Sequence, residues 1–194
     1  MKKTILFNQI SQNQTVHLLN LIFPLCNQVA FHIPDLFSVF LTENNKRIHS
    51  IFSHRTFENA SDDRYFKYLG NVNSLLNQLD PWLLECYVDV CFMGQVFQYK
   101  TKVCLFRLDE SMLQIIADKA IYDWQFPKFP EDISFLQNGK CVLQTISHEN
   151  FACLYTSDSK TKKSLQEIGI PFFCEPCSLD EIPIWTPEKT GTKE

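Results

Sequence analysis

Cys174 and Cys177, separated by two residues, have the spacing that is typical of zinc sites and of redox-active thiol pairs. A closed zinc site needs four ligands, so distant residues such as Cys141, Cys153 or His148 would have to supply the other two. A redox pair usually lies at a helix start, whereas this pair follows a predicted helix and a short strand. We expect a structural role for the pair and keep zinc binding or thiol redox chemistry as the alternative.

A histidine beside a carboxylate, as in His148 and Glu149, could act as a general acid and base. The pair ends a predicted strand, where adjacent side chains point to opposite faces, so we expect a structural or partner-binding role instead. His148 could also activate Cys141 or Cys153 as a nucleophile, which would make the protein a cysteine hydrolase. With five histidines and eight cysteines such pairs arise easily by chance, so hydrolysis is only a further alternative.

Other catalytic and nucleotide-binding signatures are absent from the 194 residues. There is no Walker phosphate loop, no G-x-G-x-x-G, no G-x-S-x-G and no H-E-x-x-H, and five glycines are few for loops that enclose a phosphate. The net charge of −4 argues against the broadly basic surface of a nucleic-acid-binding protein. We therefore expect a non-enzymatic protein without a cofactor, with zinc at the cysteine pair as the exception kept open above.

The acidic residues gather in the second half of the chain. From residue 107 to residue 149 there are four lysines or arginines against seven aspartates or glutamates. From residue 174 to residue 188 there are four acidic residues and no lysine or arginine. A solvated surface would explain this excess, and so would an acidic patch that faces a basic partner.

The eight cysteines suggest a disulfide framework only if the protein is exported. The first residues, MKKTILFNQ, contain an apolar run that is too short for a secretory signal. No stretch of the sequence approaches the 18 apolar residues of a membrane helix. We therefore expect a cytoplasmic protein with reduced thiols and no membrane contact.

The periodicity of apolar residues predicts alternating helices and strands. Two hairpins are the clearest elements: one spans residues 84–105 with one buried and one wet face, and the other spans residues 133–146 around Asn138-Gly139. Helices are predicted from Ser11, from Ser61, over residues 109–124 and over residues 157–168. Strands are predicted at residues 5–7, 29–33, 36–41, 48–57 and 151–155, followed by a final apolar stretch at 170–173.

These elements predict a single α+β domain over residues 1–185, in which three to four helices pack on a mostly antiparallel sheet with two hairpins. The polar residues 186–194 form a predicted flexible C-terminal tail.

One part of the sequence resembles a known group of proteins. The resemblance is carried by residues between 121 and 149, namely Tyr122, Asp123, Trp124, Pro130, Glu131, Asp132, Phe135, Gly139, His148 and Glu149. It is a resemblance to small uncharacterised cytosolic proteins of Gram-positive bacteria, which are associated with immunity to toxins made by the same cell. The resemblance implies a compact α+β fold and no established catalytic residues.

Together, the acidic excess and the resemblance predict a protein that binds another protein, with a basic toxin as the expected partner. The candidate contact residues are Asp123, Trp124, Glu131, Asp132, His148 and Glu149.

Overall fold

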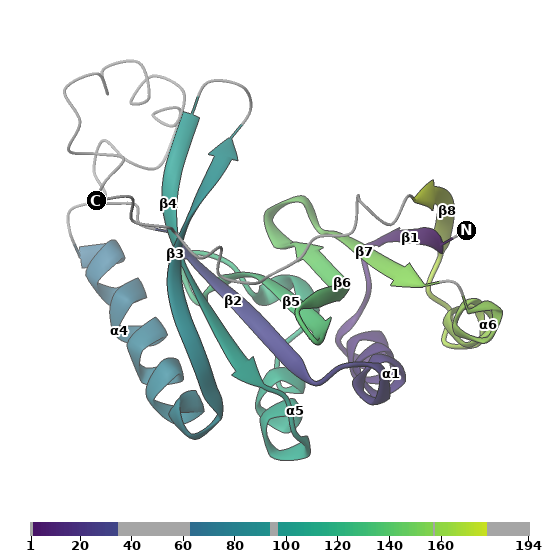
Figure 1. Cartoon of the computed structure of the whole chain (residues 1–194), viewed down its shortest axis with the longest axis horizontal. Helices are drawn as coiled ribbons and strands as arrows, with labels where there is room; N and C mark the ends of the chain where they lie inside the picture. The colour runs from purple at the N-terminus through teal and green to yellow at the C-terminus, as the bar shows by residue number, and fades with distance from the viewer. Residues whose placement is uncertain (1, 35–62, 94–96, 157, 178–194) are drawn as a thin grey trace, which may run out of the picture.

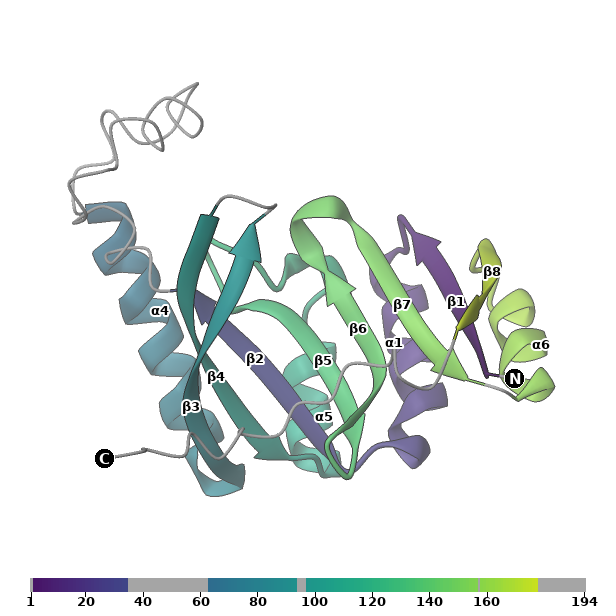
Figure 2. The same ribbon diagram turned by 45° about the horizontal axis from the view of Figure 1, so that its top comes forward.

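The chain folds into one antiparallel sheet that is covered by helices (Figure 1). This computed structural model describes residues 2–34, 63–93, 97–156 and 158–177. Within these residues the sheet has eight strands in the order β3-β4-β2-β5-β6-β7-β1-β8, and every neighbouring pair is antiparallel. The predicted α+β class is therefore confirmed. Figure 2 shows the strands side by side from β3 at one edge to β8 at the other.

The strands are β1 (Lys2–Asn8), β2 (Gln28–Pro34), β3 (Leu83–Met93), β4 (Phe97–Arg107), β5 (Glu131–Gln137), β6 (Lys140–Ile146), β7 (Phe151–Thr156) and β8 (Phe172–Cys177). The described α-helices are α1 (Gln12–Ile22), α4 (Asp63–Leu79), α5 (Glu110–Ala117) and α6 (Ser159–Glu167). Short 3₁₀ turns join them, of which η4 (Ile121–Asp123) and η5 (Ser147–Glu149) matter most below.

The main core lies between the sheet and the helices. All four described helices contribute buried residues to it, for example Leu18 of α1, Leu79 of α4, Met112 of α5 and Leu165 of α6. Alternate residues of the strands, such as Phe31, complete this core, because successive side chains of a strand point to opposite faces. The opposite face of the sheet has a smaller buried cluster, formed by Ala30, Val103, Leu105 and Leu136.

Helix α1 begins where the sequence predicts it. The backbone N–H of Gln14 donates to Oγ of Ser11 at 3.2 Å, and the backbone N–H of Ser11 donates to Oε1 of Gln14 at 2.9 Å. This reciprocal pair is a capping box, which satisfies two N–H groups that the first helical turn cannot.

The hairpin of β5 and β6 confirms the turn predicted at Asn138-Gly139. Both turn residues have positive φ, 53° at Asn138 and 77° at Gly139, as the two-residue turn requires. Asn27, which precedes β2, holds this turn: its Nδ2 donates to Oδ1 of Asn138 at 2.7 Å, and its Oδ1 accepts from the backbone N–H of Asn138 at 2.9 Å. The turn is therefore anchored by a residue more than a hundred positions away.

The hairpin of β3 and β4 forms, but it does not have the predicted buried and wet faces. The register pairs Val88 with Lys102 and Tyr87 with Val103. On each face of the hairpin, the apolar side chains of one strand therefore lie opposite the polar side chains of the other. Val88 is 66% exposed, whereas Val103 is fully buried. Alternation along each strand was predicted correctly, but alternation alone does not determine how the two patterns are aligned across the hairpin.

Helix α5 is shorter than predicted. It ends at Ala117, and Ala120 is extended with ψ of 147°, so the apolar residues up to Trp124 lie in a turn and a loop instead. The predicted strands at 36–41 and 48–57, the proposed helix start at Ser61 and the tail at 186–194 lie outside the described residues.

Candidate functional site

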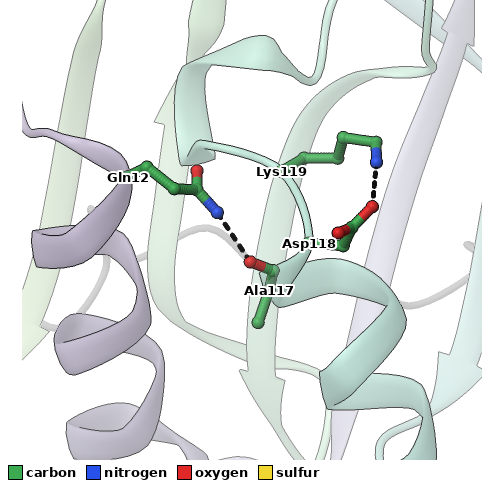
Figure 3. Close-up of polar contacts among 4 residues, drawn as sticks. All are labelled: Gln12, Ala117, Asp118 and Lys119. Carbon is green, nitrogen blue, oxygen red and sulfur yellow. Dashed lines mark hydrogen bonds and ion pairs between the residues drawn. The ribbon is translucent and has the colours of Figure 1, made fainter.

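The segment of residues 118–130 connects the end of α5 to the start of β5. Gln12 of α1 fixes its beginning, because its Nε2 donates to the carbonyl oxygen of Ala117 at 2.8 Å (Figure 3). Asp118 and Lys119 form an ion pair just beyond this point, and the Lys119 ammonium lies 5.8 Å from the centre of the Phe129 ring. The end of α5 is thus tied both to α1 and to the loop before β5.

Two buried hydrogen bonds then hold η4 in place. The backbone N–H of Ile121 donates to Oγ1 of Thr15 at 3.2 Å, and the hydroxyl of Tyr122 donates to the carbonyl oxygen of Phe7 at 3.2 Å. η4 also packs against η5, the turn between β6 and β7. The predicted residue Asp123 ends η4 and is exposed, so its carboxylate faces solvent.

Trp124 lies in the core and not on the surface. It is 1% exposed, and its ring stacks on Phe31 with centroids 5.0 Å apart and lies 5.5 Å from the ring of Phe129. Its carbonyl oxygen accepts the backbone N–H of Asp132 at 3.3 Å, which holds the loop against the start of β5. The prediction of Trp124 as a partner contact therefore needs correction, because the side chain is covered by the protein itself.

Glu131 and Asp132 begin β5 and are both partly buried. The backbone N–H of Ser147 donates to Oδ1 of Asp132 at 2.8 Å. Loss of water around each carboxylate raises its pKa above the ordinary value, and their mutual proximity raises the pKa of Glu131 further. A positive charge on His148 lowers the pKa of both carboxyl groups.

His148 and Glu149 lie on the same side, contrary to the expectation for an extended strand. They belong to the 3₁₀ turn η5, in which Nε2 of His148 comes within 3.9 Å of Oε1 of Glu149. Both side chains are more than half exposed. Because the backbone N–H of Ser147, the first residue of this turn, donates to Asp132, the turn lies beside the start of β5.

The structure therefore brings together three separate segments of the sequence, namely η4, the start of β5 and η5. We call Asp123, Glu131, Asp132, His148 and Glu149 the acidic surface. The described ion pairs of lysine are Lys119 with Asp118 and Lys163 with Glu167. Within the described part of the chain, no lysine or arginine forms an ion pair with a carboxylate of the acidic surface.

Strand β8 carries the cysteines of the C-x-x-C motif and pairs with β1, with Cys174 opposite Ile5 and Cys177 opposite Lys2. Two positions three residues apart on a strand are about 10 Å apart along it, so the strand does not bring them together. Among the residues that the structure describes, no group of three or more histidines, cysteines, aspartates or glutamates is arranged to hold a metal ion. Zinc or redox chemistry at this pair stays a hypothesis.

The residues of the hydrolase hypothesis lie on neighbouring elements. Cys141 is 3% exposed in β6, Cys153 is half-buried in β7 opposite Gln144, and His148 is in the turn between these strands. A nucleophile must reach a substrate, and burial leaves Cys141 without access to one. Hydrolysis therefore receives no support from Cys141.

Two features were not found from the sequence. A cavity of about 750 Å³ opens between α4, α5 and the loop before β5, and its lining combines polar side chains such as Asn71, Ser74 and Gln114 with the ring of Phe129. In addition, Cys86 of β3 lies directly against Cys104 of β4. No local sequence pattern predicts either feature, because both depend on how distant segments pack.

No protein-family model, curated protein or solved structure matches the chain. Among the described helices, none is both long enough and apolar enough to span a membrane. The geometry of the acidic surface is therefore the basis of the function proposed below.

Proposed function

We propose that the protein binds another protein through the acidic surface and acts as an immunity protein that neutralises a basic toxin. One observation carries this proposal. Four carboxylates, from Asp123, Glu131, Asp132 and Glu149, belong to η4, the start of β5 and η5, which pack together, and no described lysine or arginine pairs with them. A folded protein usually intersperses both signs of charge on its surface, so an uncompensated group of one sign suits a partner of the opposite sign.

The positions of these carboxylates suit recognition by arginine or lysine. Asp123 and Glu149 are exposed and would guide the approach of a basic partner, which raises the association rate at low salt. Glu131 and Asp132 are partly buried, and their raised pKa values record an energetic cost of holding negative charge there. A cation from the partner would reduce that cost, so part of the binding energy would come from these two residues.

This function requires neither a catalytic residue nor a cofactor. The hydrogen bond from the backbone N–H of Ser147 to Oδ1 of Asp132 fixes this carboxylate before any partner arrives. Such preorganisation lowers the entropy lost on association, which is what a tight inhibitor needs. Negative charge at this surface would also repel the phosphate backbone of nucleic acids.

The experiment is to co-express the chain with each protein encoded beside its gene and to measure both growth rescue and co-purification. We expect one neighbouring protein to be toxic alone, to be harmless with the chain, and to bind it with an affinity that falls as salt increases. The double variant Asp123→Asn/Glu149→Gln should weaken binding by about tenfold, since both side chains are exposed and make no described hydrogen bond.

A matched control removes the same amount of charge elsewhere. Glu167 of α6 and Glu175 of β8 are also exposed, and Glu167→Gln/Glu175→Gln should leave binding within about twofold of the wild type. The proposal fails if no neighbouring protein is bound and neutralised, or if the control variant weakens binding as much as Asp123→Asn/Glu149→Gln.

A further inference from the structure

Cys86 and Cys104 face each other across the β3–β4 hairpin. The two residues are direct cross-strand partners in the register, and their Sγ atoms are 2.7 Å apart. Two unbonded sulfur atoms do not normally approach so closely. Directly opposed residues in an antiparallel pair have Cα atoms about 4.5–5.5 Å apart, which is within the range that a disulfide spans. The register and the Sγ distance therefore place the two thiols close enough to react with each other.

The two cysteines differ in access to solvent. Cys86 is exposed on β3, which is at the edge of the described part of the sheet, whereas Cys104 is fully buried in the main core. Burial raises the pKa of the Cys104 thiol to about 12, and its contact with Cys86 raises that pKa further. A reagent in solution can therefore reach Cys86 directly, whereas burial shields Cys104 from it.

We propose that Cys86 and Cys104 form a redox-active pair that closes a cross-strand disulfide when the protein meets a low-molecular-weight disulfide such as oxidised glutathione. The thiolate of Cys86 attacks one sulfur of the oxidant, which releases one molecule of reduced thiol and leaves a mixed disulfide on Cys86. Cys104 then gives up its proton and attacks the Cys86 sulfur, which releases the second reduced thiol. In total, the two cysteines lose two protons and two electrons. The oxidant takes up these two protons and two electrons and becomes two molecules of reduced thiol.

The bond would tie the edge of the sheet to its neighbour. In the described residues β3 pairs with β4 alone, so its attachment depends on this one ladder. The disulfide would close a loop of 17 intervening residues between positions 86 and 104. A cross-link of this size restricts the unfolded chain, and we expect the oxidised protein to melt roughly 5 °C above the reduced one.

The test is to equilibrate the full-length protein with buffers of increasing oxidised-to-reduced glutathione ratio, quench it with an alkylating reagent in denaturant, and measure its mass. We expect one species that has lost the mass of two hydrogen atoms and has two fewer alkylated thiols. Proteolysis of this species should yield a peptide pair joined through Cys86 and Cys104, and excess reduced thiol should reverse the reaction.

Variants separate this pair from the other cysteines. Cys86→Ser changes an exposed residue and should abolish the linked peptide pair with little change in fold, while Cys174→Ser, which removes another exposed cysteine, should leave the pair intact. The same oxidation in denaturant should give a mixture of pairings. The proposal is overturned if glutathione stays attached to Cys86, if Cys86 joins a different cysteine, or if the folded and unfolded chains give the same mixture.

Discussion

The backbone N–H of Ser147 donates a hydrogen bond of 2.8 Å to Oδ1 of Asp132, and this bond joins the start of β5 to the turn between β6 and β7. Asp132 also has φ of 52°, in the left-handed region that aspartate and asparagine tolerate better than most residues. Asp132 thus has a structural role, through its Oδ1 acceptor and its left-handed backbone conformation. Its proposed binding role depends instead on its negative charge.

Substitution at Asp132 separates these two roles. Asp132→Ala should lower the free energy of unfolding by about 1–3 kcal/mol, because it leaves the N–H of buried Ser147 without an acceptor and places alanine at positive φ. Asp132→Asn keeps an Oδ1 acceptor and should stay near the wild type while weakening binding of a basic partner. Urea unfolding measures the first effect, and equal losses in the two variants would refute this division of roles.

The raised pKa values of Glu131 and Asp132 predict a pH-dependent contribution to stability. A group whose native pKa lies above its unfolded value contributes stability that is fully present below the unfolded pKa, about 4 for these carboxyls, and is lost as pH rises through the native pKa. The isosteric variant Glu131→Gln/Asp132→Asn cannot titrate. We expect its free energy of unfolding, measured relative to wild type in urea, to increase from about pH 3 to pH 7. A difference that is constant with pH would contradict the assignment.

We expect the exposed side chain of Asn27 to stabilise the fold. It both donates to and accepts from Asn138, at 2.7 Å and 2.9 Å, and so holds the β5–β6 turn to the start of β2. Asn27→Ala should cost about 1–2 kcal/mol in urea unfolding, since two hydrogen bonds are lost. Asn20→Ala, at an exposed position of α1, is the control and should change stability by less than about 0.5 kcal/mol. Equal effects of the two variants would show that the contact with the turn does not stabilise the fold.

Features that depend on a few adjacent residues could be predicted from the sequence. The Ser11 cap and the Asn138-Gly139 turn each satisfy a local backbone requirement, and both were found at the expected positions. The cap of α6 is similar, because the Asp158 side chain accepts the backbone N–H of Lys160 at 2.9 Å. In each case the residue type and its position together determine the hydrogen bond.

Features that depend on distant segments could not be predicted in this way. The two strand patterns of the β3–β4 hairpin were recognised, but their alignment is set by a register that pairs Val88 with Lys102 and includes an irregularity near Leu84. That same register creates the contact between Cys86 and Cys104. The candidate site is comparable: its acidic residues were identified, but their assembly depends on the packing of η4 against η5, which no local pattern encodes.

Substitution of Trp124 tests whether this residue packs the core or contacts the partner. Its ring packs on Phe31 and Phe129, so Trp124→Ala should cost about 3–5 kcal/mol through the cavity it leaves. Trp124→Phe should cost less than about 2 kcal/mol, because it also removes a buried Nε1–H that has no hydrogen-bond acceptor among the described residues. Urea unfolding followed by circular dichroism measures both. Binding of the partner by folded Trp124→Phe should equal that of the wild type, and a selective loss of binding would instead make the indole a contact that is exposed in the complex.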